Sequence, residues 1–175
     1  MADGLISFTL DADGKRRFTN ADLARMVERG LIDPEDRWEL IAGEWFDVPS
    51  EGFEHMDVRT RLVQEIILQL GRRSDLRVNT EGSFFFSDTT ELRPDLAIYR
   101  ADVGTNEMTG TDLFLIAEIM ASSHRRDMDL KRPIYAEVGV PELWLIDLDA
   151  ELVHVFREPV DGAYSSHTVH QADAK

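Results

Sequence analysis

The sequence predicts an α/β protein in which helices cover both faces of a central mixed β-sheet. Residues 94–99 and 113–120 form continuous apolar runs, which are typical of strands buried on both faces. Residues 54–71 carry apolar side chains at helical spacing, and a second helical segment follows the second run. Buried central strands with a helix before and after them favour an α/β/α layered domain.

An N-terminal helix and a β-hairpin are expected before this core. Thr19 or Asn20 can cap a helix over residues 21–29. Residues 37–48, RWELIAGEWFDV, predict a β-hairpin with its turn at residues 42–43.

The remaining strands follow from shorter runs. Residues 76–87 predict one strand, with Gly82 as a bulge. Three further strands are expected near the C-terminus, at residues 142–147, 151–157 and 164–170.

The helix after residue 120 is expected to end at Gly139. Ser122 or Ser123 would cap it, and Pro133 would then kink it. Alternatively, it begins near Asp129, so that Pro133 falls close to its first turn.

Length and composition indicate one domain. The 175 residues suit a single core. We expect a flexible arm at residues 1–17, the domain at residues 18–170 and a disordered tail at residues 171–175. The chain has no cysteine, which excludes disulfides and thiolate metal sites. Neither a signal peptide nor an apolar run of about 20 residues is present, so a cytoplasmic protein without a membrane span is expected.

The net charge of −15 argues against a general nucleic-acid coat, because phosphate contacts require Lys and Arg. It does not exclude a nuclease in which carboxylates gather a metal ion and arginines act locally. The candidate nucleic-acid contacts are Arg93, Arg125, Arg126 and Arg132.

Two carboxylates fall in the apolar runs. Asp95 opens the first run and Glu118 lies inside the second. A buried carboxylate is costly unless it is paired, protonated or bound to a metal. Asp127 and Lys131 follow on the next helix. An Asp, a Glu and a Lys from consecutive elements can supply two oxygen ligands for a hard cation and one fixed positive charge.

Simpler interpretations remain open for most of these residues. Asp95 also fits the start of a strand, and Asp127 with Lys131 fits an ordinary i,i+4 ion pair. Glu39 fits a solvent-facing strand residue, and His55 fits a packed core residue at the start of a helix. Glu118 is the hardest to explain without a function.

These residues together resemble the Uma-two endonuclease family of the PD-(D/E)XK superfamily. The segment RFTNADLARMVERGLIDPEDRWELIAGE is similar to the family's N-terminal helix and ELIDGE hairpin. His55 is similar to the histidine that opens the following helix. Pro94-Asp95 resembles the PD motif, and Glu118 the acidic position of the EXK strand. Asp127 and Lys131 resemble a D-x-x-x-K segment, and YAEVGVPELWLID resembles YARAGVPEYWLVD. The likeness extends over roughly residues 18–157.

The resemblance implies a restriction-endonuclease-like fold and a metal-dependent endonuclease that hydrolyses DNA phosphodiester bonds. Asp95, Glu118 and the carbonyl of Ile119 would bind Mg²⁺ or Mn²⁺. Met120 occupies the lysine position of EXK, so the resemblance implies that Lys131 supplies the amine from the next helix.

Glu39, His55 and Asp127 would be accessory catalytic residues by the same resemblance. Two other hypotheses stay open. One is a catalytically degenerate nuclease fold that acts as a binding or regulatory module, and the other is a hydrolase of RNA or a phosphoester metabolite. Relatives on this fold often dimerise, so a homodimer is a further alternative.

Overall fold

The computed structural model describes residues 9–10, 12, 14–33, 35–104, 108–121 and 126–171. The chain divides into two compact units. Unit 1 comprises Met1–Ser50 and Ser83–Arg93, and unit 2 comprises Glu51–Gly82 and Pro94–Lys175. The predictions for residues 1–8, for a cap at Ser122 or Ser123, for Arg125 and for residues 172–175 lie outside the described residues.

Unit 1 contains the expected helix and hairpin. The helix α1 (Asn20–Glu28) is capped by Thr19, whose side chain and backbone exchange hydrogen bonds with Asp22. The strands β3 (Trp38–Ile41) and β4 (Glu44–Asp47) pair antiparallel. Two further strands, β6 (Phe84–Ser87) and β7 (Thr90–Leu92), extend this sheet in the order β4-β3-β7-β6. A separate pair joins β1 (Thr9–Leu10) to β2 (Arg16–Arg17).

The core of unit 1 forms where α1 packs on this sheet. Leu23, Trp38 and Leu40 are buried in it together with Ile32. Gly43 lies at the hairpin turn with a φ of +79°, a conformation that favours glycine. The predicted hairpin and its turn are confirmed.

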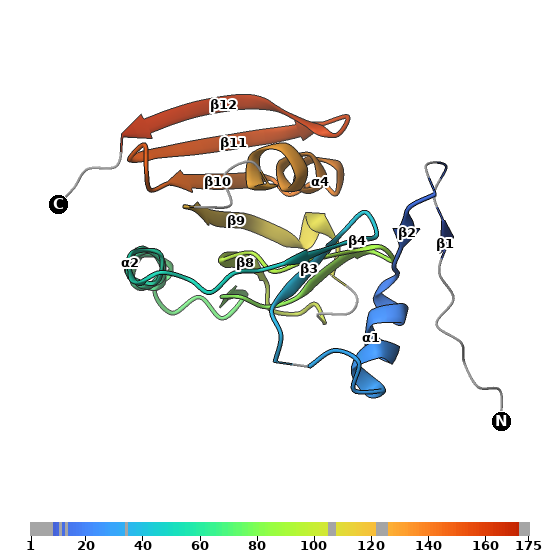
Figure 1. The fold of residues 1–175 in the computed structure, drawn as a ribbon. Helices are drawn as coiled ribbons and strands as arrows, with labels where there is room; N and C mark the ends of the chain where they lie inside the picture. The colour runs from blue at the N-terminus through green and yellow to red at the C-terminus, as the bar shows by residue number, and fades with distance from the viewer. Residues whose placement is uncertain are drawn as a thin grey trace. The chain divides into compact units, whose positions relative to one another are not determined.

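Unit 2 is built on a six-stranded mixed sheet. Its order is β12-β11-β10-β9-β8-β5, and the strands from β12 to β8 are labelled in Figure 1. Strands β9 and β10 are parallel, and the other neighbours are antiparallel. The strands are β5 (Leu76–Asn79), β8 (Leu96–Arg100), β9 (Leu113–Met120), β10 (Glu142–Asp147), β11 (Leu152–Val160) and β12 (Ala163–Gln171). A short 3₁₀ turn, η1 (Gly110–Asp112), precedes β9.

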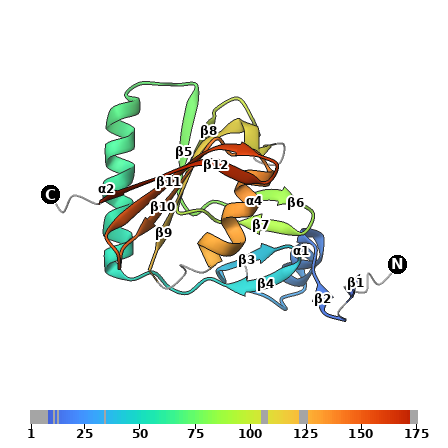
Figure 2. The ribbon, with the colours of Figure 1, turned by 90° about the horizontal axis from the view of Figure 1, so that it is seen from above.

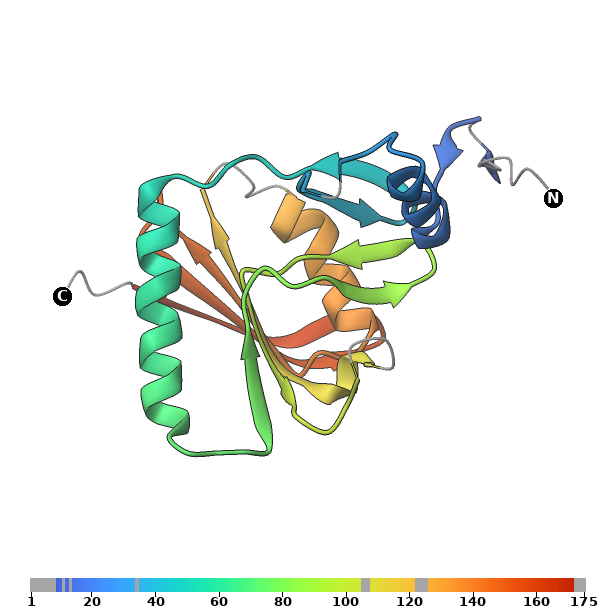
Figure 3. The same cartoon turned by 90° about the horizontal axis from the view of Figure 1, so that it is seen from below.

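Helices cover the two faces of this sheet (Figures 2 and 3). Ile66 of α2 (Phe53–Leu70) packs against Leu115 and Ala117 of β9. Tyr135 of α4 (Arg132–Glu137) instead contacts Glu118, whose side chain points to the opposite face because strand side chains alternate. The predicted α/β/α arrangement with a central mixed sheet is therefore confirmed. Among the described helices, none is both long and apolar enough to cross a membrane.

The single strand predicted over residues 76–87 is wrong. The chain instead forms β5 in unit 2 and β6 in unit 1, with a turn between them. Asn79 Oδ1 accepts a hydrogen bond from the backbone N–H of Gly82 at 2.9 Å. A side-chain acceptor at this position competes with strand pairing and favours a turn. Glu81 within the turn has a φ of +58°, which interrupts any strand.

Pro133 shapes the helix that follows β9. A π-helical turn, η2 (Asp127–Lys131), leads into α4, and the N–H of Arg132 bonds to the carbonyl of Asp127. Pro133 cannot donate a backbone hydrogen bond, so it is tolerated only close to a helix start. Pro133 lies in the first turn of α4, as one of the two alternatives expected, but α4 begins at Arg132 and not near Asp129, because the π-helical turn precedes it.

Candidate metal centre

Asp95 and Glu118 meet at the junction of β8 and β9. Leu96 lies opposite Ala117 in the antiparallel pair, so the register places Asp95 opposite Glu118 one residue further on. The backbone N–H of Ile119 donates to Asp95 Oδ2 at 2.6 Å and fixes the carboxylate against β9. This bond holds Asp95 next to the residue that follows Glu118, whereas the Glu118 carboxylate lies outside the group of ligand atoms that surrounds Asp95.

Glu118 is buried and is bound by two donors from the opposite helix. Lys131 Nζ lies 3.2 Å from Glu118 Oε1, and the Tyr135 hydroxyl donates to the same oxygen at 2.5 Å. Lys131 Nζ also lies 3.2 Å from Asp127 Oδ1. Only 3% of the Glu118 side chain and 5% of the Lys131 side chain are exposed. Asp127 and Lys131 do form an i,i+4 pair, but it is buried and shared with Glu118.

His55 stands between two carboxylates at the start of α2. Its Nε2 lies 3.3 Å from Asp95 Oδ2, and its Nδ1 lies 3.4 Å from Glu51 Oε2. Burial alone would lower the pKa of His55. The hydrogen bond to Asp95 and the negative charges of Asp95 and Glu51 outweigh burial and the opposing charge of Arg59, so the pKa is raised above its ordinary 6.5. His55 is therefore packed at the helix start, with 12% of its side chain exposed, and its neighbours there include two carboxylates.

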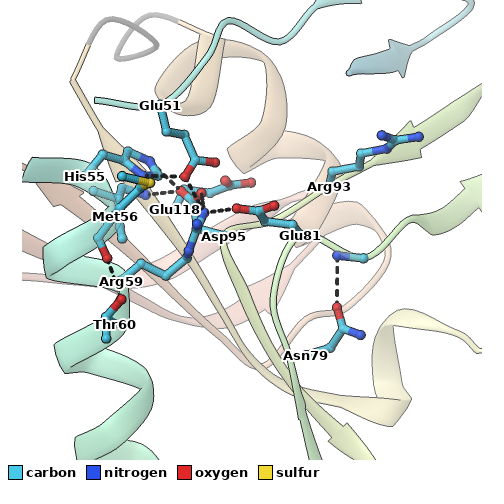
Figure 4. Close-up of polar contacts among 12 residues, drawn as sticks. Glu51, His55, Met56, Arg59, Thr60, Asn79, Glu81, Arg93, Asp95 and Glu118 are labelled. Atoms are coloured by element: carbon cyan, nitrogen blue, oxygen red, sulfur yellow. Dashed lines mark hydrogen bonds and ion pairs between the residues drawn. The ribbon is translucent and has the colours of Figure 1, made fainter. Parts of the chain in front are cut away.

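Arg59 lies one turn further along α2 (Figure 4). Its Nη1 is 2.6 Å from Glu51 Oε2 and 3.6 Å from Asp95 Oδ1, and it forms a third ion pair with Glu81. The cluster thus holds three carboxylates around one guanidinium and one imidazole.

The donor set fits a divalent cation. Among the described residues, Glu51, His55 and Asp95 each offer one ligand atom, and these atoms lie within 4.8 Å of one another. Carboxylate oxygens suit Mg²⁺ and Mn²⁺, and imidazole nitrogen is also a common metal ligand. Asp95 belongs both to this group and to the set predicted from the sequence.

Two predicted site residues belong to unit 1. Glu39 is 1% exposed, so the solvent-facing alternative for it is wrong. Its Oε1 accepts a hydrogen bond from the backbone N–H of Arg93 at 3.0 Å. The Arg93 guanidinium lies 5.1 Å from the centre of the Trp38 ring. In unit 2, the Arg132 guanidinium stacks in the same way over Phe156, at 5.2 Å.

The structure adds four residues that sequence reasoning missed: Glu51, Arg59, Glu81 and Tyr135. The sequence spacing of three of these residues does carry a signal. His55 and Arg59 are spaced four residues apart, which places their side chains on one helix face, and Glu51 lies four residues before His55, ahead of the helix. Tyr135 likewise follows Lys131 by four residues. Glu81 has no local signal, because only the turn after β5 brings it to Arg59.

The mixed sheet and the two helices that cover it define a restriction-endonuclease-like α/β protein. The chain matches the family model of Uma2, described as "Putative restriction endonuclease", over residues 22–175, and it belongs to this family.

A crystal structure described as a "putative nuclease belonging to DUF820" from Anabaena variabilis ATCC 29413 shares the fold. The two chains are 19% identical, with a TM-score of 0.66, and the match covers 87% of this chain and 83% of the other. None of the curated proteins matches this chain.

Proposed function

We propose that this protein is a metal-dependent endonuclease that hydrolyses DNA phosphodiester bonds. The observation that carries the proposal is the meeting of Asp95, Glu118 and Lys131, with the Ile119 N–H on Asp95 and the Lys131 ammonium on Glu118. Membership of the family described as "Putative restriction endonuclease" supports it.

The ion would be held by Asp95, Glu118 and the carbonyl of Ile119, with His55 as a nitrogen donor beside Asp95. Mg²⁺ and Mn²⁺ are the candidates, because most of these ligands are oxygens. A bound divalent ion supplies Lewis-acid catalysis for phosphodiester hydrolysis. Because the pKa of His55 is raised, more of the imidazole is protonated near neutral pH, and a protonated imidazole must lose its proton before it can bind a cation.

Lys131 supplies a fixed positive charge next to the reacting phosphate. Its burial excludes water, which strengthens its interaction with the charge that develops in the transition state. Asp127 and Glu118 hold the ammonium from two sides and set its position. Tyr135 orients Glu118 through its hydroxyl. Glu39 and His55 are accessory catalytic residues in this proposal.

Local arginines would bind the DNA backbone, since the chain as a whole is strongly acidic. We assign this role to Arg93, Arg126 and Arg132, with Arg125 as a fourth candidate. Guanidinium groups suit phosphate recognition because they present several donors in one plane.

A non-catalytic binding module is the second candidate function. The net charge of −15 and the methionine at position 120 favour it, because nucleases of this superfamily carry a lysine two residues after the acidic strand position.

Plasmid nicking in the presence of Mg²⁺ or Mn²⁺ tests the proposal. Wild type is compared with Asp95→Asn, which removes a ligand charge with little change in size. Asp57→Asn is the matched control, because Asp57 lies on the exposed side of α2 in an i,i+4 pair with Arg61. We expect Asp95→Asn to lose about a hundredfold or more in rate, and Asp57→Asn to cut as wild type does.

Equal cutting by wild type and Asp95→Asn would refute the site. A wild-type protein that cuts neither DNA nor RNA with either ion would favour the binding module. Cleavage of RNA alone would replace the proposed substrate.

A further inference from the structure

Three carboxylates converge on one nitrogen of Arg59. Nη1 lies 2.6 Å from Glu51 Oε2 and 3.6 Å from Asp95 Oδ1, and it is also paired with Glu81 Oε1. The acids come from three separate segments: one precedes α2, one lies in the turn after β5, and one precedes β8. Oxygens gathered from separate segments around one positive centre are the arrangement that proteins build for a divalent cation.

The guanidinium is enclosed by its partners. The exposed fractions of the side chains are 15% for Arg59, 10% for Glu51 and 13% for Asp95. Carboxylates that are this little exposed to water repel one another and require a positive charge among them. Arginine keeps its charge at every accessible pH, so this compensation is permanent.

The backbone around Glu81 holds its carboxylate in the ion pair with Arg59. It has a φ of +58°, a strained conformation for a residue with a side chain, and its backbone N–H bonds to the carbonyl of Pro94 at 3.1 Å. Strain of this kind persists where the surrounding structure enforces it, and it is concentrated at functional sites. The Glu81 carboxylate is paired with Arg59, which connects this strained turn to the cluster of acids.

The two oxygens of Asp95 face different groups. Oδ1 is directed at Arg59, whereas Oδ2 accepts from the Ile119 N–H and faces His55. A carboxylate shared between two positive centres is typical of two-metal phosphodiesterases, in which the ions clamp the attacking and the leaving oxygen. In this protein, one of the two sides of Asp95 is already taken by a guanidinium (Figure 4).

We propose that Arg59 takes the place of a second divalent ion, so that the site works with one ion and one built-in cation. Arg59 would then stabilise negative charge on the phosphate from the side opposite His55, with Glu51 and Glu81 as its anchors. This inference rests on the proposed function, because it assigns Arg59 a role in the same site.

Calorimetric titration of Mn²⁺ into the full chain tests the inference without relying on activity. Arg59→Met removes the charge and keeps an unbranched side chain, and Arg59→Lys keeps the charge as a control. We expect one Mn²⁺ per chain in wild type and in Arg59→Lys. We expect two in Arg59→Met, because Glu51, Glu81 and Asp95 are then open to a cation. Plasmid nicking by Arg59→Met should fall about tenfold or more and recover in part when the Mn²⁺ concentration is raised about tenfold.

Wild type that binds two ions would overturn the inference, and so would Arg59→Met that binds one ion with unchanged affinity. Glu81→Gln keeps the test decisive if Arg59→Met fails to fold. It should still bind one Mn²⁺ within about threefold of the wild-type affinity, since Glu81 serves Arg59. Loss of Mn²⁺ binding in Glu81→Gln would make Glu81 a metal ligand and refute the inference. Wild type that binds no Mn²⁺ would reject the proposed function itself, whatever the variants do.

Discussion

Replacing Lys131 with methionine should destabilise unit 2 strongly. Lys131 is the positive member of a buried triad whose acids, Glu118 and Asp127, are 3% and 2% exposed. Methionine fills a similar volume but leaves both acids without their shared ammonium. Removal of one partner from a buried ion pair typically costs about 3–5 kcal/mol in free energy of unfolding. For a chain of this length, that corresponds to a fall in Tm of roughly 6–20 °C.

Lys15→Met is the matched control. Lys15 is 66% exposed and lies 3.8 Å from Glu44, so its pair is a surface pair. Such pairs contribute less than about 1 kcal/mol. The same chemical substitution should therefore have a small effect at position 15 and a large one at position 131.

Urea unfolding followed by tryptophan fluorescence measures the difference. Trp144 is the tryptophan of unit 2, whereas Trp38 and Trp45 lie in unit 1. Trp144 therefore reports on the unit that contains the triad, and Trp38 and Trp45 report on the unit that contains the control residue Lys15. A loss below about 1 kcal/mol for Lys131→Met, equal to that for Lys15→Met, would refute the claim that the ammonium compensates buried acids. Adding Glu118→Gln to Lys131→Met should recover part of the loss, because one uncompensated charge is removed.

Three other predictions concern single hydrogen bonds and protons. Tyr135→Phe should lower the stability of unit 2 by about 1.5–3 kcal/mol in urea unfolding, because it removes a buried hydrogen bond to the Glu118 carboxylate. Tyr164→Phe is the comparison: it removes a hydrogen bond to a neutral backbone carbonyl and should cost about 1 kcal/mol. Burial opposes ionisation of Asp22, but its hydrogen bonds with the helix cap outweigh burial and lower its pKa below 3.8. The stability that the ionised carboxylate confers is therefore present at neutral pH and is lost as the pH falls below about 4. The difference in free energy of unfolding between wild type and Asp22→Asn should shrink between pH 7 and pH 3, and a constant difference would contradict this. The raised pKa of His55 predicts that Mn²⁺ affinity falls as the pH is lowered from about 8 to about 6, and calorimetry on His55→Gln should show a flatter dependence.

Several features of the site were predictable because they leave local signals. Asp95 and Glu118 interrupt apolar strands, and an acid in such a strand requires a partner wherever the chain folds. Lys131 follows Asp127 at the spacing of one helix turn. The residues missed are those whose role depends on neighbours from other segments, and Glu81 is the clearest case, because only the turn after β5 places it beside Arg59.

The sequence by itself determined the α/β class, the buried acids and the family resemblance, because periodicity and short motifs are properties of neighbouring residues. It did not determine that residues 76–87 divide between two sheets, since the turn depends on one side-chain bond from Asn79 to the backbone of Gly82. Nor could it decide which charges neutralise one another. Tertiary structure alone placed Lys131 on Glu118 and Arg59 among three acids, because pairing of buried charges is set by distance in space.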